Sequence, residues 1–246
     1  MNPGRFIVTG ASGSIGREVV KGLAERGVPV LMACRNQKKG NAVMESILSE
    51  VPGADLQLGM VDLSSTASIR EFAGSLGEME ISGLFNNAGA IFRDFALTPE
   101  GVERTFAVNY FGPVTLTEEL LPRLREGSII VNMVSVTARI SSLSDEDFRP
   151  DRKRFGQLKT YGKAKLALLR YSRELAGRRP DLIVNVADPG VVNSNMISMG
   201  RWFDPLADVI FRPFCKSPQK GAIPALNAIF SDRRMRYFSG NSSREM

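Results

Sequence analysis

Short apolar runs alternate with amphipathic helical patterns along most of the 246-residue chain. The runs have the length and aliphatic content of buried strands, and each helical pattern places its apolar residues on one face. A strand–helix–strand order requires parallel strands joined by right-handed crossovers. The alternation therefore predicts an α/β fold, in which a doubly wound parallel sheet (the Rossmann fold) forms a single domain over residues 1–246. The expected strands are Arg5–Val8, Val28–Ala33, Leu56–Val61, Ile81–Phe85, Ser128–Val134 and Leu182–Ala187.

The helices expected between these strands are marked by apolar stripes, caps and stops. In a doubly wound sheet they cover both faces, and ligands bind beyond the carboxyl ends of the strands. The expected helices run from Ile15 to a stop at Gly27, over Asn36–Glu50, from a cap at Ser64 or Ser65 through Leu76, over Thr98–Leu124 with an interruption at Gly112-Pro113, and over Tyr161–Ala176.

Two stretches lack a regular pattern. Ser141–Thr160 is rich in charged residues and is expected to form a surface loop or a short lid. The stretch after Tyr237 is short and shows no clear last strand.

The chain contains no histidine. This excludes a Ser-His-Asp triad, a Cys-His pair and HExxH zinc chemistry, and we expect no metal site. Proton transfer must fall to Tyr, Lys, Asp, Glu or Cys side chains. Cys34 and Cys215 provide no disulfide framework, no apolar run is long enough to span a membrane, and we expect no signal peptide. We therefore expect a cytoplasmic location.

The formal net charge is +6 at pH 7, and the sequence pI is about 9.5. Spread over the whole chain, this excess is mild and is typical of a solvated basic surface. No clustered basic and aromatic motif indicates nucleic-acid binding, so we expect no nucleic-acid partner. The positive charge instead suits an anionic cofactor or substrate.

The segment TGASGSIG joins the first expected strand to the first expected helix. Its glycines, Gly10, Gly13 and Gly16, are spaced G-x-x-G-x-x-G rather than G-x-G-x-x-G. A dinucleotide site needs backbone that approaches a pyrophosphate closely and a helix whose free N–H groups point at it. The context favours dinucleotide binding, although a plain strand-to-helix turn would also explain the segment.

Arg35 follows the second expected strand, in the segment MACRN. NAD enzymes place an acidic residue here to bind the ribose hydroxyls of the adenosine, but Cys34 takes that position. A guanidinium binds a 2′-phosphate through paired hydrogen bonds. The segment therefore indicates NADP as the cofactor, and NAD is the alternative. Arg35 could also be an arginine that only faces solvent at the end of a strand.

Tyr161 and Lys165, in YGKAK, lie one turn apart on the same face of an expected helix. A nearby ammonium favours the phenolate and lowers the pKa of a tyrosine. In a chain without histidine, Tyr161 is the best candidate for acid–base catalysis. A chance pairing is the alternative, because Y-x-x-x-K is a common pattern.

In order along the chain, these segments resemble the motifs of the short-chain dehydrogenase/reductase family, from Phe6 to about Gly190. The resemblance includes VDL near the adenine, NNAG after the fourth strand, and DPGVV near the nicotinamide; VNYFG and VNMVSVTA complete it. It implies a catalytic set of Asn109, Ser135, Tyr161 and Lys165. It implies a cofactor site of Gly10, Ser12, Gly13, Ser14, Ile15, Gly16, Arg35, Asn36, Asp62, Leu63, Asn87, Ala88, Gly89, Tyr161, Lys165, Pro189, Gly190, Val192 and Ser194.

The resemblance also implies the chemistry, an NAD(P)-dependent interconversion of a carbonyl and an alcohol. Tyr161 would give a proton to the substrate oxygen, and Ser135 would donate a hydrogen bond to that oxygen. Lys165 would hold the nicotinamide ribose and lower the pKa of Tyr161. Asn109 would anchor a water that links Lys165 to solvent.

Within the family, the MACRN segment, the long spacing between Ser135 and Tyr161 and the Ser217-Pro218 pair resemble retinol-dehydrogenase-like and protochlorophyllide-reductase-like members. That resemblance implies a preference for NADP and for bulky apolar substrates. A segment at about 193–220, rich in Met and aromatic residues, is expected to cover an apolar or aromatic carbonyl or alcohol. The same segment could instead pack against the core or against a partner subunit. Family members commonly pair, so a homodimer is an open expectation.

Two positions depart from the family pattern. Ser14 stands where the family has its middle glycine, and Ser194 stands where a threonine usually closes the P-G segment. The Ser14 hydroxyl would bind a phosphate or cap the helix. Because Ser14 weakens the expected phosphate contact, a catalytically silent dinucleotide-binding sensor or scaffold on the same fold is the alternative function.

Overall fold

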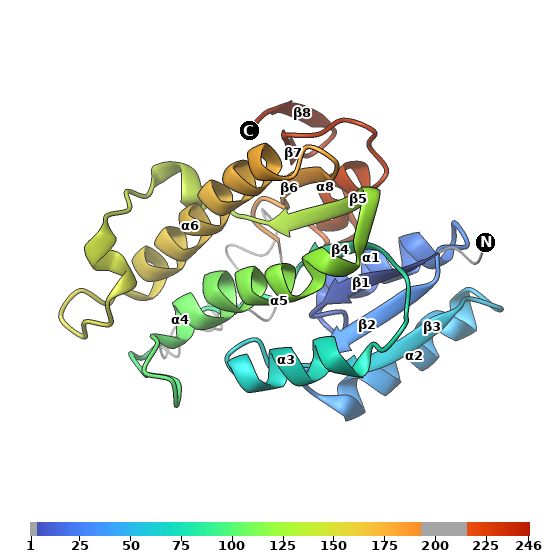
Figure 1. Cartoon of the computed structure of the whole chain (residues 1–246), viewed down its shortest axis with the longest axis horizontal. Helices are drawn as coiled ribbons and strands as arrows, with labels where there is room; N and C mark the ends of the chain where they lie inside the picture. The colour runs from blue at the N-terminus through green and yellow to red at the C-terminus, as the bar shows by residue number, and fades with distance from the viewer. Residues whose placement is uncertain (1–3, 193–215) are drawn as a thin grey trace.

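The computed structural model describes residues 4–192 and 216–246. One eight-stranded sheet with the order β3-β2-β1-β4-β5-β6-β7-β8 runs through it (Figure 1). The first seven strands are parallel, and β8 pairs with β7 in the antiparallel sense. The strands are β1 Arg5–Thr9, β2 Val30–Cys34, β3 Leu56–Met60, β4 Ile81–Asn86, β5 Leu124–Met133, β6 Ile183–Asp188, β7 Arg236–Ser239 and β8 Ser242–Glu245. The predicted doubly wound α/β fold is confirmed.

Helices cover both faces of this sheet (Figure 1). Along β1, Phe6 and Val8 enter one core, which also contains Val19 of α1, while Ile7 enters the other core with Leu116 of α5. Successive side chains of a strand point to opposite faces, so a fully apolar strand needs a helical layer on each side. The helices are α1 Ser14–Ala24, α2 Gln37–Glu50, α3 Thr66–Ser75, α4 Arg104–Phe106, α5 Gly112–Leu120, α6 Gln157–Arg178 and α8 Pro218–Ile229.

The long helical region expected over Thr98–Leu124 begins later, at Arg104. The buried side chain of Glu103 caps it by accepting hydrogen bonds from the backbone N–H groups of Thr105 (2.9 Å) and Phe106 (3.0 Å). The interruption expected at Gly112-Pro113 is wrong, because a π-helical turn, η1 (Ala107–Phe111), leads directly into α5. The wider turn adds a residue without ending the helix.

The C-terminal stretch forms a hairpin, so the expectation that no last strand follows Tyr237 is also wrong. Tyr237 pairs with Val186 of β6, and the chain turns at Gly240 (φ 59°) to form β8. Four-residue strands carry too little periodicity to stand out in a sequence, and here pairing with β6 defines them. The Gly240-Asn241 pair was the available turn signal.

The charged stretch forms a surface loop over residues 141–156, as expected, with one short 3-10 turn, η4 (Asp145–Phe148), whereas its last four residues begin α6. The Phe148 ring packs against the rings of Phe106, Tyr110 and Phe111. This aromatic contact joins the loop to the helices in front of α5, and an ion pair between Lys163 and Asp147 joins it to α6.

Candidate active site

The glycine-rich turn between β1 and α1 lies against the turn that follows β4. Gly10 has a φ of +62°, and a Cβ there would lie 2.9 Å from the Cα of Ala88. A Cβ on Gly16 would lie 2.4 Å from the Gly10 carbonyl oxygen. Only glycine fits at either position without moving backbone.

Gly13 and Ser14 occupy the beginning of α1. Gly13 is the N-cap, has an ordinary extended backbone (φ −82°) and contributes no side-chain cap. Ser14 is the first residue of the helix, so it does not cap α1 as one of the sequence hypotheses proposed. The first N–H groups of α1 therefore lack a side-chain partner at the cap, a geometry typical of anion sites.

Asn87 links this turn to the NNAG segment through hydrogen bonds. Its Nδ2 donates hydrogen bonds to the carbonyl oxygens of Thr9 (2.8 Å) and Gly10 (3.2 Å). The Thr9 hydroxyl accepts hydrogen bonds from the backbone N–H groups of Asn87 and Ala88, both at 3.0 Å. Two loops that are far apart in the sequence thus form one rigid edge beyond the carboxyl ends of β1 and β4.

Cys34 ends β2 and is buried beside the glycine-rich turn. Burial raises the pKa of its thiol, against the opposite effect of hydrogen bonds with Ser12 and the backbone of Ala11. The side chain at the position of the usual acid is therefore neutral at pH 7. Arg35 follows with an exposed side chain, and Asn36 caps α2 by accepting a hydrogen bond from the Lys39 N–H (2.9 Å).

Asp62 and Leu63 follow β3 at the same edge. The Asp62 Oδ1 accepts hydrogen bonds from the backbone N–H (2.8 Å) and hydroxyl (2.6 Å) of Ser64. Leu63 is buried against the start of α5, where a Cβ on Gly112 would lie 2.2 Å from the Leu63 carbonyl oxygen. The sequence pattern predicted that Gly112 interrupts the helix. In the structure, a glycine is needed there because the Leu63 carbonyl oxygen approaches so closely.

Asn109 lies fully buried in the π-helical turn η1. Its Nδ2 donates to the carbonyl oxygens of Ala90 (2.7 Å) and Thr105 (2.8 Å), and its Oδ1 accepts from the Ala90 N–H (3.2 Å). A Cβ on Gly89 would lie 2.9 Å from the Asn109 Oδ1 and 3.6 Å from the Lys165 Nζ. The side chains of Asn109 and Lys165 therefore both lie next to Gly89.

Lys165 is buried on α6, and its Nζ donates a hydrogen bond of 2.8 Å to the carbonyl oxygen of Met133 at the end of β5. The Nζ lies 5.8 Å from the centre of the Tyr161 ring. Burial lowers the pKa of Lys165 from 10.5 to about 7, because the charged form loses hydration. The sequence did not single out Met133, and nothing in its side chain could have done so.

Tyr161 is 6% exposed, and burial raises its pKa from 10.0 to about 12. Its hydrogen bond with Ser135 lowers this pKa, whereas the negative charge of Asp188 raises it further. The expectation that Lys165 lowers the pKa of Tyr161 does not describe this structure, because burial dominates and the Lys165 ammonium donates to Met133 instead. Tyr161 is a neutral phenol over the whole physiological pH range.

Ser135 caps a short 3-10 helix, η3 (Val136–Ile140), at the end of β5. Its hydroxyl oxygen accepts hydrogen bonds from the Thr137 hydroxyl (3.0 Å) and N–H (3.3 Å). The Ser135 proton therefore points away from Thr137 and is available to another acceptor.

The P-G segment turns at Pro189 and Gly190, whose φ is +72°. Val192 and Ile15 both reach Gly221 of α8, where an added Cβ would lie 2.7 Å and 3.5 Å from them. These two expected cofactor residues thus share one neighbour. Ser194 and the greater part of the expected substrate-covering segment at 193–220 lie outside the described residues.

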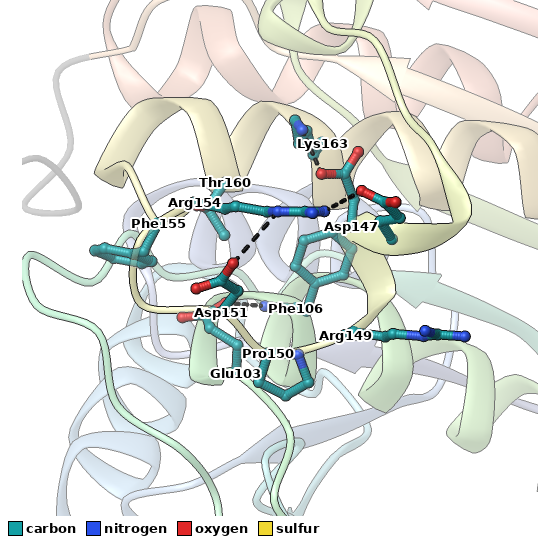
Figure 2. A pocket seen from close by; sticks show the side chains of 11 residues that line it. Glu103, Phe106, Asp147, Arg149, Pro150, Asp151, Arg154, Phe155, Thr160 and Lys163 are labelled. Atoms are coloured by element: carbon teal, nitrogen blue, oxygen red, sulfur yellow. Dashed lines mark hydrogen bonds and ion pairs between the residues drawn. The ribbon is translucent and has the colours of Figure 1, made fainter.

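A separate small, open hollow lies on the outer side of α6, between the loop over residues 141–156 and α4. Figure 2 shows Arg154 turned toward Asp151 and Lys163 turned toward Asp147 there. Lys163 falls on the opposite side of α6 from Tyr161 and Lys165. The hollow is therefore not part of the expected catalytic site.

Within residues 4–192 and 216–246, no helix combines the length and the apolar character of a membrane-spanning segment. In the same ranges, no three His, Cys, Asp or Glu side chains gather as a metal site.

Comparisons with known proteins identify the family of this chain. Residues 5–201 match the family model of the short-chain dehydrogenases. Retinol dehydrogenase 12 of Mus musculus is 35% identical over 237 residues, which cover 94% of this chain and 74% of that protein.

Two solved structures share the fold. An uncharacterised protein of Mycobacterium Paratuberculosis superposes with a TM-score of 0.79 at 25% identity, covering 99% of this chain and 84% of that one. A short-chain dehydrogenase of Sphingobium yanoikuyae, solved in complex with NADPH, gives a TM-score of 0.74 at 22% identity, covering 97% and 88%. With the family match over most of its length, the chain belongs to the short-chain dehydrogenase family, and it is an oxidoreductase that interconverts carbonyl and alcohol groups with NAD(P).

Proposed function

We propose that this enzyme prefers NADPH and acts on a bulky apolar or aromatic carbonyl or alcohol. The observation that carries the proposal is the hydrogen bond between the half-buried Ser135 and the buried Tyr161, beside Lys165 at the carboxyl edge of the sheet. A neutral phenol and a neighbouring serine hydroxyl can each donate a hydrogen bond, which suits a carbonyl oxygen. The roles of the individual residues below are part of this proposal.

The site fits a dinucleotide. Gly10 and Gly16 leave room that a Cβ would fill, and α1 begins without a side-chain cap. The Asn87 hydrogen bonds keep this edge rigid. When bound, the dinucleotide supplies or accepts a hydride at the substrate carbon.

The chain's own residues handle the proton. Tyr161 donates its phenolic proton to the carbonyl oxygen during reduction, and Ser135 stabilises the same oxygen by donating a hydrogen bond. Lys165, with a pKa of about 7, is able to give or take a proton behind Tyr161 near neutral pH. Asn109 holds the Ala90 backbone next to Gly89 and so fixes one wall around Lys165.

The NADPH preference is supported by the neutral Cys34 and the exposed Arg35 after β2. A carboxylate at position 34 would repel a 2′-phosphate, whereas a thiol does not. Arg35 offers the charge and donors that a phosphate binds.

The apolar substrate is supported by exposed hydrophobic side chains around the site. Val136 next to Ser135, Ile140 in the same short helix, and Val191 next to Gly190 are 40%, 85% and 57% exposed. Small-molecule pockets are mostly apolar with a few polar anchors. The relatives named retinol dehydrogenase agree with a substrate of this kind.

The test is NADPH consumption with a panel of aldehydes and ketones, from long-chain and aromatic to small and polar. Turnover of the apolar members, lost in Tyr161→Phe, supports the proposal. Turnover of only small polar carbonyls overturns the substrate class. NADPH binding without any turnover, unchanged in Tyr161→Phe, would favour the sensor or scaffold instead.

The expected cytoplasmic location and homodimer remain part of the proposal. Fluorescence microscopy of a tagged chain tests the location. Sedimentation of the purified protein, with and without NADPH, tests the dimer.

A further inference from the structure

A buried carboxylate lies directly behind the site. Asp188 ends β6 and is 2% exposed. Its Oδ1 accepts a hydrogen bond from the Gly190 N–H (2.9 Å), and its Oδ2 accepts one from the Tyr237 hydroxyl (2.7 Å). Burying a charge is costly unless its partners are held in place. The partners of Asp188 therefore indicate which groups this carboxylate holds in place.

Two guanidinium groups lie over the ring of Tyr237, which belongs to β7. The guanidinium of Arg139 lies 4.5 Å from the ring centre, and that of Arg244 lies 5.0 Å from it. The Tyr237 hydroxyl accepts a hydrogen bond from the Arg139 Nε (3.2 Å) while it donates to Asp188. Its donor and one of its acceptor sites are used, so its orientation is fixed.

Arg139 connects this cluster to the segment that carries Ser135. It belongs to η3, whose cap is Ser135, and its Nη2 lies 3.7 Å from the Asp188 Oδ2. On its other side η3 packs on α6, where a Cβ on Gly162 would lie 2.4 Å from the Ser141 Oγ. The segment is thus held between α6, which carries Tyr161, and the Asp188–Tyr237 pair.

We propose that Asp188 is a positioning residue for the reaction: held by Tyr237 and Arg139, it fixes the Pro189–Gly190 turn relative to Ser135. The inference rests on the proposed function and deepens it, since it names the residue that keeps the Pro189–Gly190 turn in a fixed position relative to Ser135. The last strands of the sheet, which carry none of the family motifs, thereby take part in the active site. Tyr237 lies 49 residues from Asp188 in the sequence, so only the fold brings the pair together.

Asp188 also places a negative charge near Tyr161. This charge raises the pKa of Tyr161, in the same direction as burial. The charged and titratable groups that face Asp188 are Arg139 of η3, Tyr237 of β7 and Tyr161 of α6. Lys216 lies beside Gly190, and Arg244 lies over the Tyr237 ring. Removing the carboxylate charge should therefore make Tyr161 a stronger acid.

The first experiment measures backbone order by hydrogen exchange of the intact protein, so it does not depend on turnover. In Tyr237→Phe and Asp188→Asn, we expect exchange about ten-fold faster in peptides spanning both 135–141 and 186–192, because a hydrogen bond to a charged group is lost. The matched control is Tyr171→Phe, which removes the hydroxyl of another buried tyrosine bonded to a carboxylate (Glu118 of α5, 2.8 Å) outside both segments. Unchanged exchange in both segments overturns the inference.

The second experiment measures carbonyl reduction. We expect kcat to fall about ten-fold in Tyr237→Phe and in Asp188→Asn, with a much smaller change in KM and none in Tyr171→Phe. The alkaline limb of the pH–rate profile should move to lower pH in Asp188→Asn, which removes the charge, and stay in place in Tyr237→Phe, which keeps it. A role in stability alone would move neither kcat at constant temperature nor this limb.

The outcomes separate the two proposals. If the wild type is active, and the variants exchange faster but keep the wild-type kcat and alkaline limb, only the positioning role is overturned. Wild type without turnover overturns the proposed function, and because the positioning role serves that reaction, it falls too. Hydrogen exchange then still shows whether the cluster orders the two segments.

Discussion

The Nζ of Lys165 donates a hydrogen bond of 2.8 Å to the main-chain oxygen of Met133. The donor lies on α6 and the acceptor at the end of β5, so this bond holds the ammonium against the sheet, beside the ring of Tyr161. Burial lowers the pKa of Lys165 to about 7, while it raises the pKa of Tyr161 to about 12. The site therefore combines a phenol that keeps its proton with an amine that exchanges one near neutral pH.

The burial of Lys165 makes stability depend on pH. The unfolded chain keeps this lysine protonated up to about pH 10.5, whereas the folded protein releases the proton near pH 7. Between these values the unfolded state binds more protons, so the free energy of unfolding rises with pH, by at most about 1.4 kcal/mol per unit. We expect urea unfolding to show this gain in the wild type and not in Lys165→Met. Parallel pH profiles for the two proteins would contradict the lowered pKa.

Replacement of Tyr161 by phenylalanine removes the proposed proton donor and leaves the ring. We expect kcat for carbonyl reduction to fall about 10²–10⁴-fold, the usual contribution of a general acid. NADPH affinity, measured by fluorescence titration, should stay nearly unchanged. Because the pKa of Tyr161 is raised to about 12, the wild-type rate should show no loss from phenol deprotonation at physiological pH. A Tyr161→Phe variant that keeps the wild-type kcat would contradict this assignment.

The glycines at 10, 13 and 16 are not equivalent. Gly16→Ala places a Cβ 2.4 Å from the Gly10 carbonyl oxygen, so we expect a loss of several °C in Tm together with weaker NADPH binding. Gly13→Ala is the matched control, because its backbone is ordinary and its Cβ would meet only the Gly10 carbonyl oxygen at 3.2 Å. Calorimetry and NADPH titration of both variants check the contrast, and equal effects would refute it.

Ser14 is the first residue of α1, in the place of the family's middle glycine. We expect Ser14→Gly to change the Kd for NADPH by less than about three-fold, and to lower stability by at most about 1 kcal/mol, the helical cost of glycine. Isothermal titration calorimetry measures the first effect and urea unfolding the second. A large gain in affinity would show that the serine obstructs the phosphate site.

Arg35 is the residue on which the NADPH preference depends. We expect Arg35→Ala to weaken NADPH binding about ten-fold or more and to leave NADH binding unchanged, because only NADPH carries the 2′-phosphate. Arg152→Ala, at another exposed arginine, alters the net charge equally and serves as the control. Equal NADH and NADPH affinities in the wild type would overturn the preference.

The apolar periodicity of this sequence determined the fold. Each strand of a doubly wound sheet must be apolar on both faces and each helix on one, so strands such as Arg5–Thr9 and helices such as α6 were visible locally. The same holds for Tyr161 and Lys165, because a spacing of one helical turn places two side chains on one face. Gly10 and Gly16 were visible for a similar reason, since a close turn between a strand and a helix excludes larger residues.

Only the tertiary structure decided how the site works. The direction of the pKa shift of Tyr161 was wrong in the sequence prediction, because that shift depends on burial and not on the nearest cation along the helix. The π-helical turn that presents Asn109, the Met133 carbonyl that orients Lys165, and the Asp188–Tyr237 contact all depend on segments that are distant in the sequence. A sequence pattern records which faces must be buried, whereas desolvation and long-range hydrogen bonds exist only after the chain has folded around them.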